Sequence, residues 1–416
     1  MTIDSVTLTE IVAGHFRPNP PQRIGVAVSG GSDSTALMHV LADWCREHDI
    51  TLEVITIDHG LRDAAACEAG RVACQAADLG LVHQTLCWVG WNGKGNLQDE
   101  ARRARYQLIT EWAKTRGLSH VALGHTLDDQ AETFVMRLGR AAGVDGLAAM
   151  PARRWHNGIT LVRPVLGVSR ADLRSELERR DVGWIDDPTN DNMAYERVRV
   201  RKALVGLADL GIDAATLSTV ADNMASARKA LDWQSYIAAR EVARIEFGDV
   251  VFDRKRWRVL HDEISRRLLR QALNWVSGAH YGARQTALAA TLAAIKDGTG
   301  ITLHGCQVVT DKTSIRIFRE YSAVRMTTCG EGAYWDARWQ VQGPWERGLH
   351  VGPLGDAPLR NIEGWRDMGR PRAAIAASPA IWRKTELIAA PHAMAASPWR
   401  AELANGAESF FTQLMP

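Results

Sequence analysis

Short apolar runs and amphipathic stretches alternate through the first half of the chain. The apolar runs are short enough to be buried strands and lie at residues 24–28, 52–58, 81–88 and 120–124. The amphipathic stretches have apolar residues every three or four positions and lie at residues 35–44, 63–79, 97–116 and 127–140. Because helices usually connect such strands, the alternation predicts an α/β fold in which helices cover both faces of a parallel sheet.

One further strand and helix are expected before this pattern ends. Residues 159–165 are apolar, and Ser169 with Asp172 three positions later is typical of the start of a helix, which would run to Arg180. Residues 183–202 show little periodicity. We therefore expect them to form a connecting segment.

The second half of the chain has a different pattern. Helix-compatible stretches lie at residues 214–247, 255–276 and 285–296. Runs rich in β-branched residues follow and predict a small sheet, at residues 300–304, 306–310 and 314–318. Residues 331–416 show no clear period, so we expect a small mixed α/β domain there without deriving its topology. The expected division is a first domain at residues 1–190, a linker at 191–205, a mainly helical domain ending in a small sheet at 206–325, and a C-terminal domain at 326–416.

Composition narrows the class of protein. The 416 residues are 46% hydrophobic, which is enough for two or three domains with their own cores, and the net charge of +2 means that a nucleic-acid surface must come from local clusters. The six cysteines form no C-x-x-C pair, so we expect reduced thiols and a cytoplasmic protein. Asp4 and Glu10 make the first residues unlike a signal peptide, and no apolar stretch approaches the roughly 20 residues of a membrane span.

The first expected strand ends in a loop that suits an anion. Its residues are Ser29, Gly30, Gly31, Ser32, Asp33 and Ser34. The glycines let the backbone approach a ligand, the serine hydroxyls can donate hydrogen bonds, and a helix follows whose first N–H groups point back at the loop. The loop therefore predicts a phosphate or pyrophosphate site. The loop has neither the G-x-G-x-x-G pattern of dinucleotide-binding folds nor the Gly-Lys-Ser/Thr ending of a Walker loop, which argues against these two classes of nucleotide site. The alternative is an ordinary turn between a strand and a helix.

A second group of polar residues follows the strand at residues 120–124. His125 is expected at the end of the strand, Asp128 and Asp129 in the first turn of the next helix, and Glu132 and Thr133 one turn later. Such carboxylates can simply complement the helix dipole. Beside a pyrophosphate loop they could instead hold Mg²⁺, while His125 could shuttle a proton or stabilise charge.

Two weaker signals complete the candidate chemistry. Asp58 and His59 open the sequence Asp58-His-Gly-Leu-Arg62 at the end of the second strand, where an acidic residue can meet a ribose hydroxyl or can form a plain turn. Basic residues cluster at Arg102, Arg103 and Arg105, at residues 196–202 and at residues 254–270. These clusters suit a phosphate backbone or are solvated helix faces.

The joint pattern resembles the PP-loop ATP pyrophosphatase superfamily, and within it the tRNA(Ile)-lysidine synthetase family. The resemblance rests on residues 29–34, 58–62 and 123–133, and on the stretches at residues 163–166, 184–190 and 197–201, so it covers roughly the first half of the chain. Val198 departs from the pattern, since the family usually has Asn there.

The resemblance implies a reaction and a fold. Members of this family use ATP to adenylate the C2 oxygen of the wobble cytidine in an isoleucine tRNA with a CAU anticodon, and L-lysine then displaces AMP to form lysidine. A Rossmann-like sheet of the PP-loop type is implied, with ATP and Mg²⁺ as cofactors. The C-terminal domain would contact tRNA, no membrane is involved, and a homodimer is one option for the oligomeric state.

The resemblance also implies roles for the candidate residues. Asp33, His125, Asp128 and Asp129 would be catalytic, with Asp33 and Asp129 as the Mg²⁺ ligands. The ATP-binding group would be Ser29, Gly30, Gly31, Ser32, Asp33, Ser34, Asp58 and His59. The tRNA-binding group would be Arg102, Arg105, Arg197 and Arg201.

Three alternatives remain open at this point. A tRNA thiolase of the same superfamily would activate the base in the same way, but it usually needs paired cysteines. A small-molecule ligase or amidotransferase would share the loop but would normally bring another partner domain. A non-catalytic module that binds nucleotide or tRNA is the third alternative, and the intact set of Asp33, His125, Asp128 and Asp129 argues against it.

Overall fold

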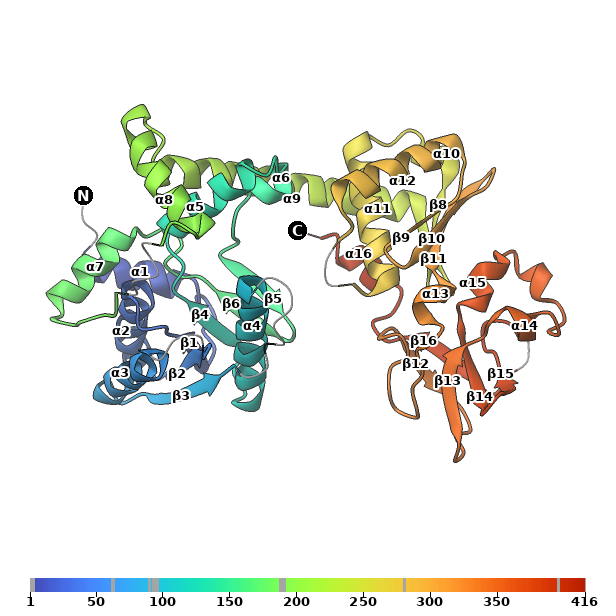
Figure 1. Cartoon of the computed structure of the whole chain (residues 1–416), viewed down its shortest axis with the longest axis horizontal. Coiled ribbons are helices and arrows are strands. Elements are labelled where there is room, and N and C mark those ends of the chain that lie inside the picture. The colour runs from blue at the N-terminus through green and yellow to red at the C-terminus, as the bar shows by residue number, and fades with distance from the viewer. Residues whose placement is uncertain are drawn as a thin grey trace. The chain divides into compact units, whose positions relative to one another are not determined.

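A computed structural model describes residues 4–60, 64–88, 91, 97–186, 192–279, 282–394 and 397–415. The chain divides into two compact units, Met1–Arg228 and Lys229–Pro416, and each unit is described by itself (Figure 1). The finer division into four parts stays a prediction. Among the described residues, no single helix is long and apolar enough to cross a membrane, and one pair of helices bent by 97° meets the criteria of length and composition only when taken together.

The first unit is built on a six-stranded sheet with the order β3-β2-β1-β4-β6-β5. Its strands are β1 (Arg23–Ala27), β2 (Thr51–Asp58), β3 (Val82–Cys87), β4 (His120–Leu123), β5 (Arg153–His156) and β6 (Ile159–Val162). All neighbouring pairs are parallel except β5 with β6. The expected parallel sheet is thus confirmed. The strand order reverses between β1 and β4, and the loops at such a point commonly bind ligands.

Helices cover both faces of this sheet (Figure 1). The helices that lie wholly within this unit are α1 (Ser5–Gly14), α2 (Ser32–Glu47), α3 (Ala64–Asp78), α4 (Leu97–Thr115), α5 (Leu127–Leu138), α6 (Val144–Leu147), α7 (Arg170–Arg179) and α8 (Glu196–Leu207), with the 3₁₀ turn η2 (Ala208–Leu210). One core joins Leu37 and Leu41 of α2 to Val26 of β1, and another joins Trp112 of α4 to Val121 of β4. Each sheet face is therefore closed by its own apolar layer, which leaves the strand ends open for function.

The second unit begins within the long helix α9 (Ala214–Val242) and contains an antiparallel sheet with the order β7-β8-β11-β10-β9. Its strands are β7 (Ala243–Glu246), β8 (Asp249–Asp253), β9 (Ile301–Leu303), β10 (Cys306–Thr310) and β11 (Ser314–Arg319). Its helices are α10 (Arg254–Trp257), α11 (Asp262–Ser277) and α12 (Gln285–Asp297). The expected small sheet is thus present at β9 to β11. The last helix, α16 (Ser409–Thr412), packs Phe410 and Phe411 into the same core.

The rest of this unit is the small mixed α/β part expected at the C-terminus. A three-stranded sheet contains β13 (Leu349–Pro353), β14 (Pro379–Arg383) and β15 (Glu386–Ala389), and β12 (Trp339–Gln342) pairs with β16 (Arg400–Leu403). The short helices are α13 (Tyr321–Val324), α14 (Asp356–Leu359), η3 (Trp365–Met368) and α15 (Arg372–Ala376).

Two expectations about local structure were wrong. The helix-compatible stretch at residues 214–247 gives way to β7 at Ala243, because Phe247 and Gly248 both have positive φ and close a hairpin with β8. The expected connecting segment at residues 183–202 contains most of α8, in which Val198 is buried. Arginines interrupt the apolar pattern of α8 because they bind carboxylates of α5.

Candidate active site

A cavity of about 550 Å³ lies at the carboxyl ends of β1, β2 and β4 in the first unit. The candidate residues on its wall are Ser29, Gly31, Ser34, Asp58, His59, Arg105, His125, Asp129, Arg197 and Arg201. Because parallel strands end at the same edge of a sheet, loops that are far apart in the sequence converge here. The cavity therefore brings together most of the site predicted from sequence.

The glycine and serine loop lies between β1 and the first turn of α2. The Ser34 hydroxyl accepts a hydrogen bond from the Ser29 N–H (3.1 Å) and donates one to the Gly31 carbonyl (3.2 Å). Gly31 is the N-cap of α2 and supplies no side chain to the first N–H groups of the helix. The loop is thus held in a fixed shape while donors at the helix start remain available for an anion.

Two glycines in this region allow close contacts that another residue would prevent. Gly30 has φ +87°, and a Cβ atom there would lie 2.4 Å from Cδ1 of Ile185, whose N–H donates to the Gly30 carbonyl (2.9 Å). A Cβ atom on Gly124 would lie 2.8 Å from Cα of Ser34. The end of β4 therefore rests directly on the start of α2, which the sequence analysis did not anticipate.

Helix α5 presents carboxylates to arginines of α8. Thr126 caps α5 in a capping box with Asp129, whose Oδ2 accepts from the Thr126 N–H (2.8 Å). Glu132 is only 1% exposed, and it accepts from Nε of Arg197 (2.6 Å) and from Nε of Arg201 (2.8 Å). Arg197 also donates to Asp129 (3.0 Å). The arginines that the sequence suggested for tRNA are therefore also bound to the acidic group of the site.

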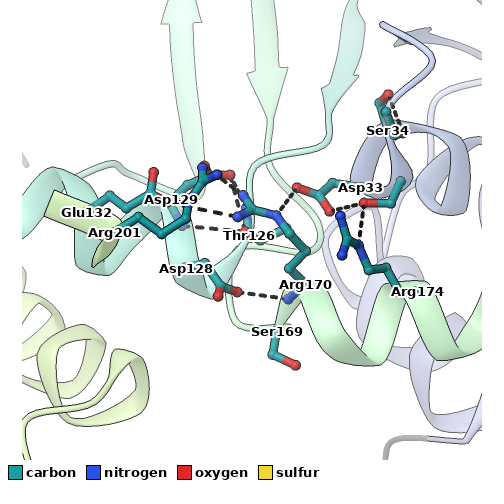
Figure 2. A network of polar contacts seen from close by, with 12 residues as sticks. Asp33, Ser34, Thr126, Asp128, Asp129, Glu132, Ser169, Arg170, Arg174 and Arg201 are labelled. Atoms are coloured by element: carbon teal, nitrogen blue, oxygen red, sulfur yellow. Dashed lines mark hydrogen bonds and ion pairs between the residues drawn. The ribbon is translucent and has the colours of Figure 1, made fainter. Parts of the chain in front are cut away.

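Arg170, the first residue of α7, joins the two halves of the site (Figure 2). Its Nε donates to Asp33 Oδ2 (2.9 Å), its Nη2 to Asp129 Oδ1 (3.4 Å), and its backbone N–H to Asp128 Oδ2 (2.8 Å). Its Nη1 lies 3.9 Å from Glu132. One guanidinium thus bridges the pyrophosphate loop and the acidic start of α5. The sequence analysis missed Arg170, although the Ser169 cap was a signal for the helix that carries it.

These contacts give the two candidate metal ligands different acidities. Burial raises the pKa of Asp33, and the opposing effect of the Arg170 guanidinium is smaller. Burial also acts to raise the pKa of Asp129, but Arg197 and Arg170 outweigh it and the pKa is lowered. Asp129 is therefore the more firmly ionised of the two carboxylates.

Two histidines on the cavity wall stay neutral near pH 7. Burial lowers the pKa of His59 and that of His125, and nearby arginines including Arg105 lower both further. In the part of the chain that the structure describes, the Nδ1 atom of each ring is buried without a hydrogen-bond partner. A neutral imidazole with an unsatisfied nitrogen can bind a ligand group or accept a proton.

Several predicted residues lie away from the wall. Gly30, Ser32 and Asp33 belong to the loop but not to the wall. Asp128 is also absent from the wall, and its carboxylate holds the start of α7. Arg102 lies outside the cavity with its guanidinium 5.3 Å from the Tyr106 ring centre. Asp58 lines the cavity and also forms a turn, since its carboxylate accepts from the Gly60 N–H (2.8 Å). Leu61, Arg62 and residues 187–190 of the motifs lie outside the described residues.

The carboxylates of the site fit a metal ion that takes most of its ligands from bound phosphate and from water. Within the described ranges, no group of three or more His, Cys, Asp or Glu side chains is placed to hold a metal. Asp33 and Asp129 nevertheless converge on the same guanidinium of Arg170 beside the loop. One or two carboxylates completed by phosphate oxygens and water are the usual donors for Mg²⁺ in nucleotide sites.

Comparison with known proteins agrees with this geometry. Residues 5–208 match a family model described as a PP-loop domain. A tRNA(Ile)-lysidine synthase from Ruegeria pomeroyi is 48% identical over 415 residues, which cover 100% of this chain and 99% of that protein. One from Bradyrhizobium diazoefficiens is 41% identical, with 66% of this chain and 79% of that protein covered. One from Wolbachia pipientis is 33% identical, with 76% of each covered.

Proposed function

The chain belongs to the tRNA(Ile)-lysidine synthase family, a family of ATP-dependent tRNA-modifying ligases with a PP-loop domain, and from this we propose that it converts the wobble cytidine of an isoleucine tRNA with a CAU anticodon into lysidine. The C2 oxygen of the cytidine attacks the α-phosphate of ATP, and pyrophosphate leaves. The amine of L-lysine then attacks C2, and AMP leaves with that oxygen. The observation that carries the proposal is the cavity in which the glycine loop and the acidic start of α5 face each other across Arg170.

The glycine loop is proposed to hold the pyrophosphate part of ATP. Gly30 and Gly31 bring the backbone close to the phosphates, and Ser29, Ser32 and Ser34 supply hydroxyl groups. The first N–H groups of α2 add donors that favour negative charge. Asp58 and His59, at the end of β2, are proposed to contact the nucleoside part, which is supported by their position on the cavity wall and by the pairing of β2 with β1.

Mg²⁺ is proposed to bind at Asp33 and Asp129. When bound, the ion would neutralise phosphate charge and favour departure of pyrophosphate. Arg170 already compensates both carboxylates, so it holds them close together before ligands enter.

Asp129 is proposed to receive the ammonium group of lysine, because it is ionised and lies on the cavity wall. Burial lowers the pKa of His125 to about 3, so its neutral ring is proposed to orient the attacking amine by accepting a hydrogen bond at Nδ1. Asp128 acts here through Arg170, by fixing the start of α7. Arg105, Arg197 and Arg201 are proposed to contact the nucleotide that enters the cavity.

The remaining proposals concern the setting of the reaction. The substrates are cytoplasmic molecules, so we place the enzyme in the cytoplasm. Residues 326–416 are proposed to contact the tRNA away from the anticodon. A homodimer stays a prediction, which sedimentation of the purified protein tests.

The test is a reconstituted reaction with ATP, Mg²⁺, labelled lysine and isoleucine tRNA with a CAU anticodon. Label is expected to enter this tRNA and not a methionine tRNA with the same anticodon. Asp33→Asn should abolish pyrophosphate release while tRNA binding persists. Sulfur transfer to the tRNA, or adenylation of a free small molecule without lysine incorporation, would contradict the proposal and favour one of the alternatives.

A further inference from the structure

The arginines beside the active site fall into two groups with different partners. Arg170, Arg197 and Arg201 contact carboxylates. A second group, which we call the arginine belt, lies on α4, on α5 and around the β5–β6 hairpin. Its members are Arg102, Arg105, Arg137, Arg154 and Arg163. Among the residues that the structure describes, no ion pair joins a belt arginine to a carboxylate.

Four of the five belt arginines contact carbonyl oxygens or an aromatic ring instead. Arg163 donates to the Pro151 carbonyl (2.8 Å), and Arg137 donates to the carbonyls of Gly146 and Ala149 (2.8 Å each). The guanidiniums of Arg102 and Arg105 lie 5.3 Å and 5.4 Å from the centre of the Tyr106 ring. These partners hold the guanidiniums in place and leave their positive charge uncompensated.

The belt arginines lie near enough to one another to interact electrostatically. Burial lowers the pKa of Arg163 and of Arg137, and the charge of Arg102 lowers both further, with Arg154 adding to the effect on Arg163. Burial alone would raise the pKa of Tyr106, but Arg105, Arg102 and Arg163 outweigh it and lower the pKa to about 8. A phenol whose pKa is lowered in spite of burial reports a strongly positive environment.

The belt arginines differ in how exposed they are. Arg105 lies on the wall of the cavity, and Arg163 is only 2% exposed. Arg102 on α4 and Arg154 on the edge strand β5 are exposed. The positive charge thus runs from inside the cavity to the surface of the first unit.

We propose that the arginine belt binds the sugar–phosphate backbone of the RNA next to the nucleotide that enters the cavity. This inference rests on the proposed function and deepens it. Phosphates are the groups that uncompensated arginines bind best, and such contacts fix the register of a nucleic acid without reading its bases. The belt, and not the carboxylate-bound pair Arg197 and Arg201, then carries most of the electrostatic affinity for the RNA.

The experiment measures tRNA affinity at several salt concentrations, without ATP or lysine. The variants are Arg102→Gln, Arg154→Gln and both together, and the matched control is Arg103→Gln, the neighbour on α4 whose Nη1 lies 2.6 Å from Glu100. Each belt variant should weaken binding roughly three- to tenfold and reduce the slope of log affinity against log salt by about one. The control should leave the slope unchanged.

Other outcomes would overturn the inference. An unchanged slope in the double variant, or an equal loss in Arg103→Gln, would show that the belt makes no phosphate contact. Displacement of the RNA by poly-glutamate at equal charge concentration would assign the belt to an acidic protein partner. Unchanged ATP affinity in every variant checks that the site is folded. The two proposals can fail separately. If the belt variants reduce the salt slope but the wild-type protein makes no lysidine, the proposed function is refuted and this inference stands.

Discussion

At the scale of single residues, the site is a balance of buried charges. The carboxylates of Asp129 and Glu132 face the guanidiniums of Arg170, Arg197 and Arg201 at 2.6 to 3.9 Å. Each carboxylate is already paired with an arginine. A cationic ligand that binds one of them must therefore displace an arginine, because no carboxylate of this group is left unpaired. Glu132 is the most buried carboxylate of the group, so its loss should cost the most.

Replacing Glu132 with Gln tests this balance. The substitution keeps the shape of the side chain but leaves Arg201 without its buried anion and leaves Arg197 with Asp129 alone. Breaking a buried pair in this way destabilises by about 3–5 kcal/mol, and partial exposure of the arginines reduces the expected loss to about 2 kcal/mol. Unfolding in urea measures it. Glu10→Gln is the control, since Glu10 pairs with Arg17 at the surface and should change stability by less than about 1 kcal/mol. Equal losses of stability in Glu132→Gln and Glu10→Gln would show that the buried ion pairs of Glu132 stabilise the protein no more than a surface pair does.

At the scale of elements, the sequence predicted what depends on local pattern. The strands β1, β2 and β4, the helices α2, α5 and α7, and the cap at Ser169 follow from apolar periodicity and capping chemistry. The hairpin of β5 and β6 was missed, although Asn157 and Gly158, both with positive φ, are a known signal for one.

The contacts by which Arg170 joins the glycine loop to the start of α5 could not be predicted from local pattern. Arg170 is separated from Asp33 by 137 positions, and only the packing of α7 against α2 brings them together. The turning of Asp128 towards α7 depends on the same packing. Periodicity and motif spacing describe neighbours along the chain, so contacts of this kind stay hidden until the elements are assembled.

The contact between β4 and α2 can be tested at Gly124. In Gly124→Ala the new Cβ atom would lie 2.8 Å from Cα and 2.9 Å from N of Ser34, so the start of α2 must move. We expect a loss of about 1–3 kcal/mol in stability, as for other overpacked sites, and weaker ATP binding measured by calorimetry. Gly70→Ala is the control, because Gly70 lies in α3 with open space around it and alanine should stabilise the helix by about 0.5–1 kcal/mol. Normal ATP affinity in Gly124→Ala would show that the loop tolerates the shift.

At the scale of the whole molecule, the second unit depends on buried polar contacts that join distant segments. Asp249 in β8 accepts from Arg316 of β11 (2.9 Å) and from Arg370 of the C-terminal part (3.2 Å). Arg338, also from that part, donates to the Gly248 carbonyl (2.8 Å). The turn between β7 and β8 is therefore held by two segments of the C-terminal part, one just before β12 and one just before α15. These contacts tie the stability of the five-stranded sheet to that of the C-terminal part.

Replacing Asp249 with Asn should therefore weaken the whole second unit. Arg370 would keep its charge in a buried place without a carboxylate, and Arg316 would keep only Glu246 as a partner, which together cost about 3 kcal/mol. Scanning calorimetry should show a transition at lower temperature for this unit. Hydrogen exchange should speed up in β8 and α15 together, because Arg370, which contacts Asp249, lies two residues before α15. Asp356→Asn is the matched control: Asp356 is 54% exposed, contacts Arg372 and Arg360 at the surface, and should shift stability by less than about 1 kcal/mol. Faster exchange in β8 alone would mean that Asp249 stabilises only its own sheet and that the C-terminal part folds independently of it.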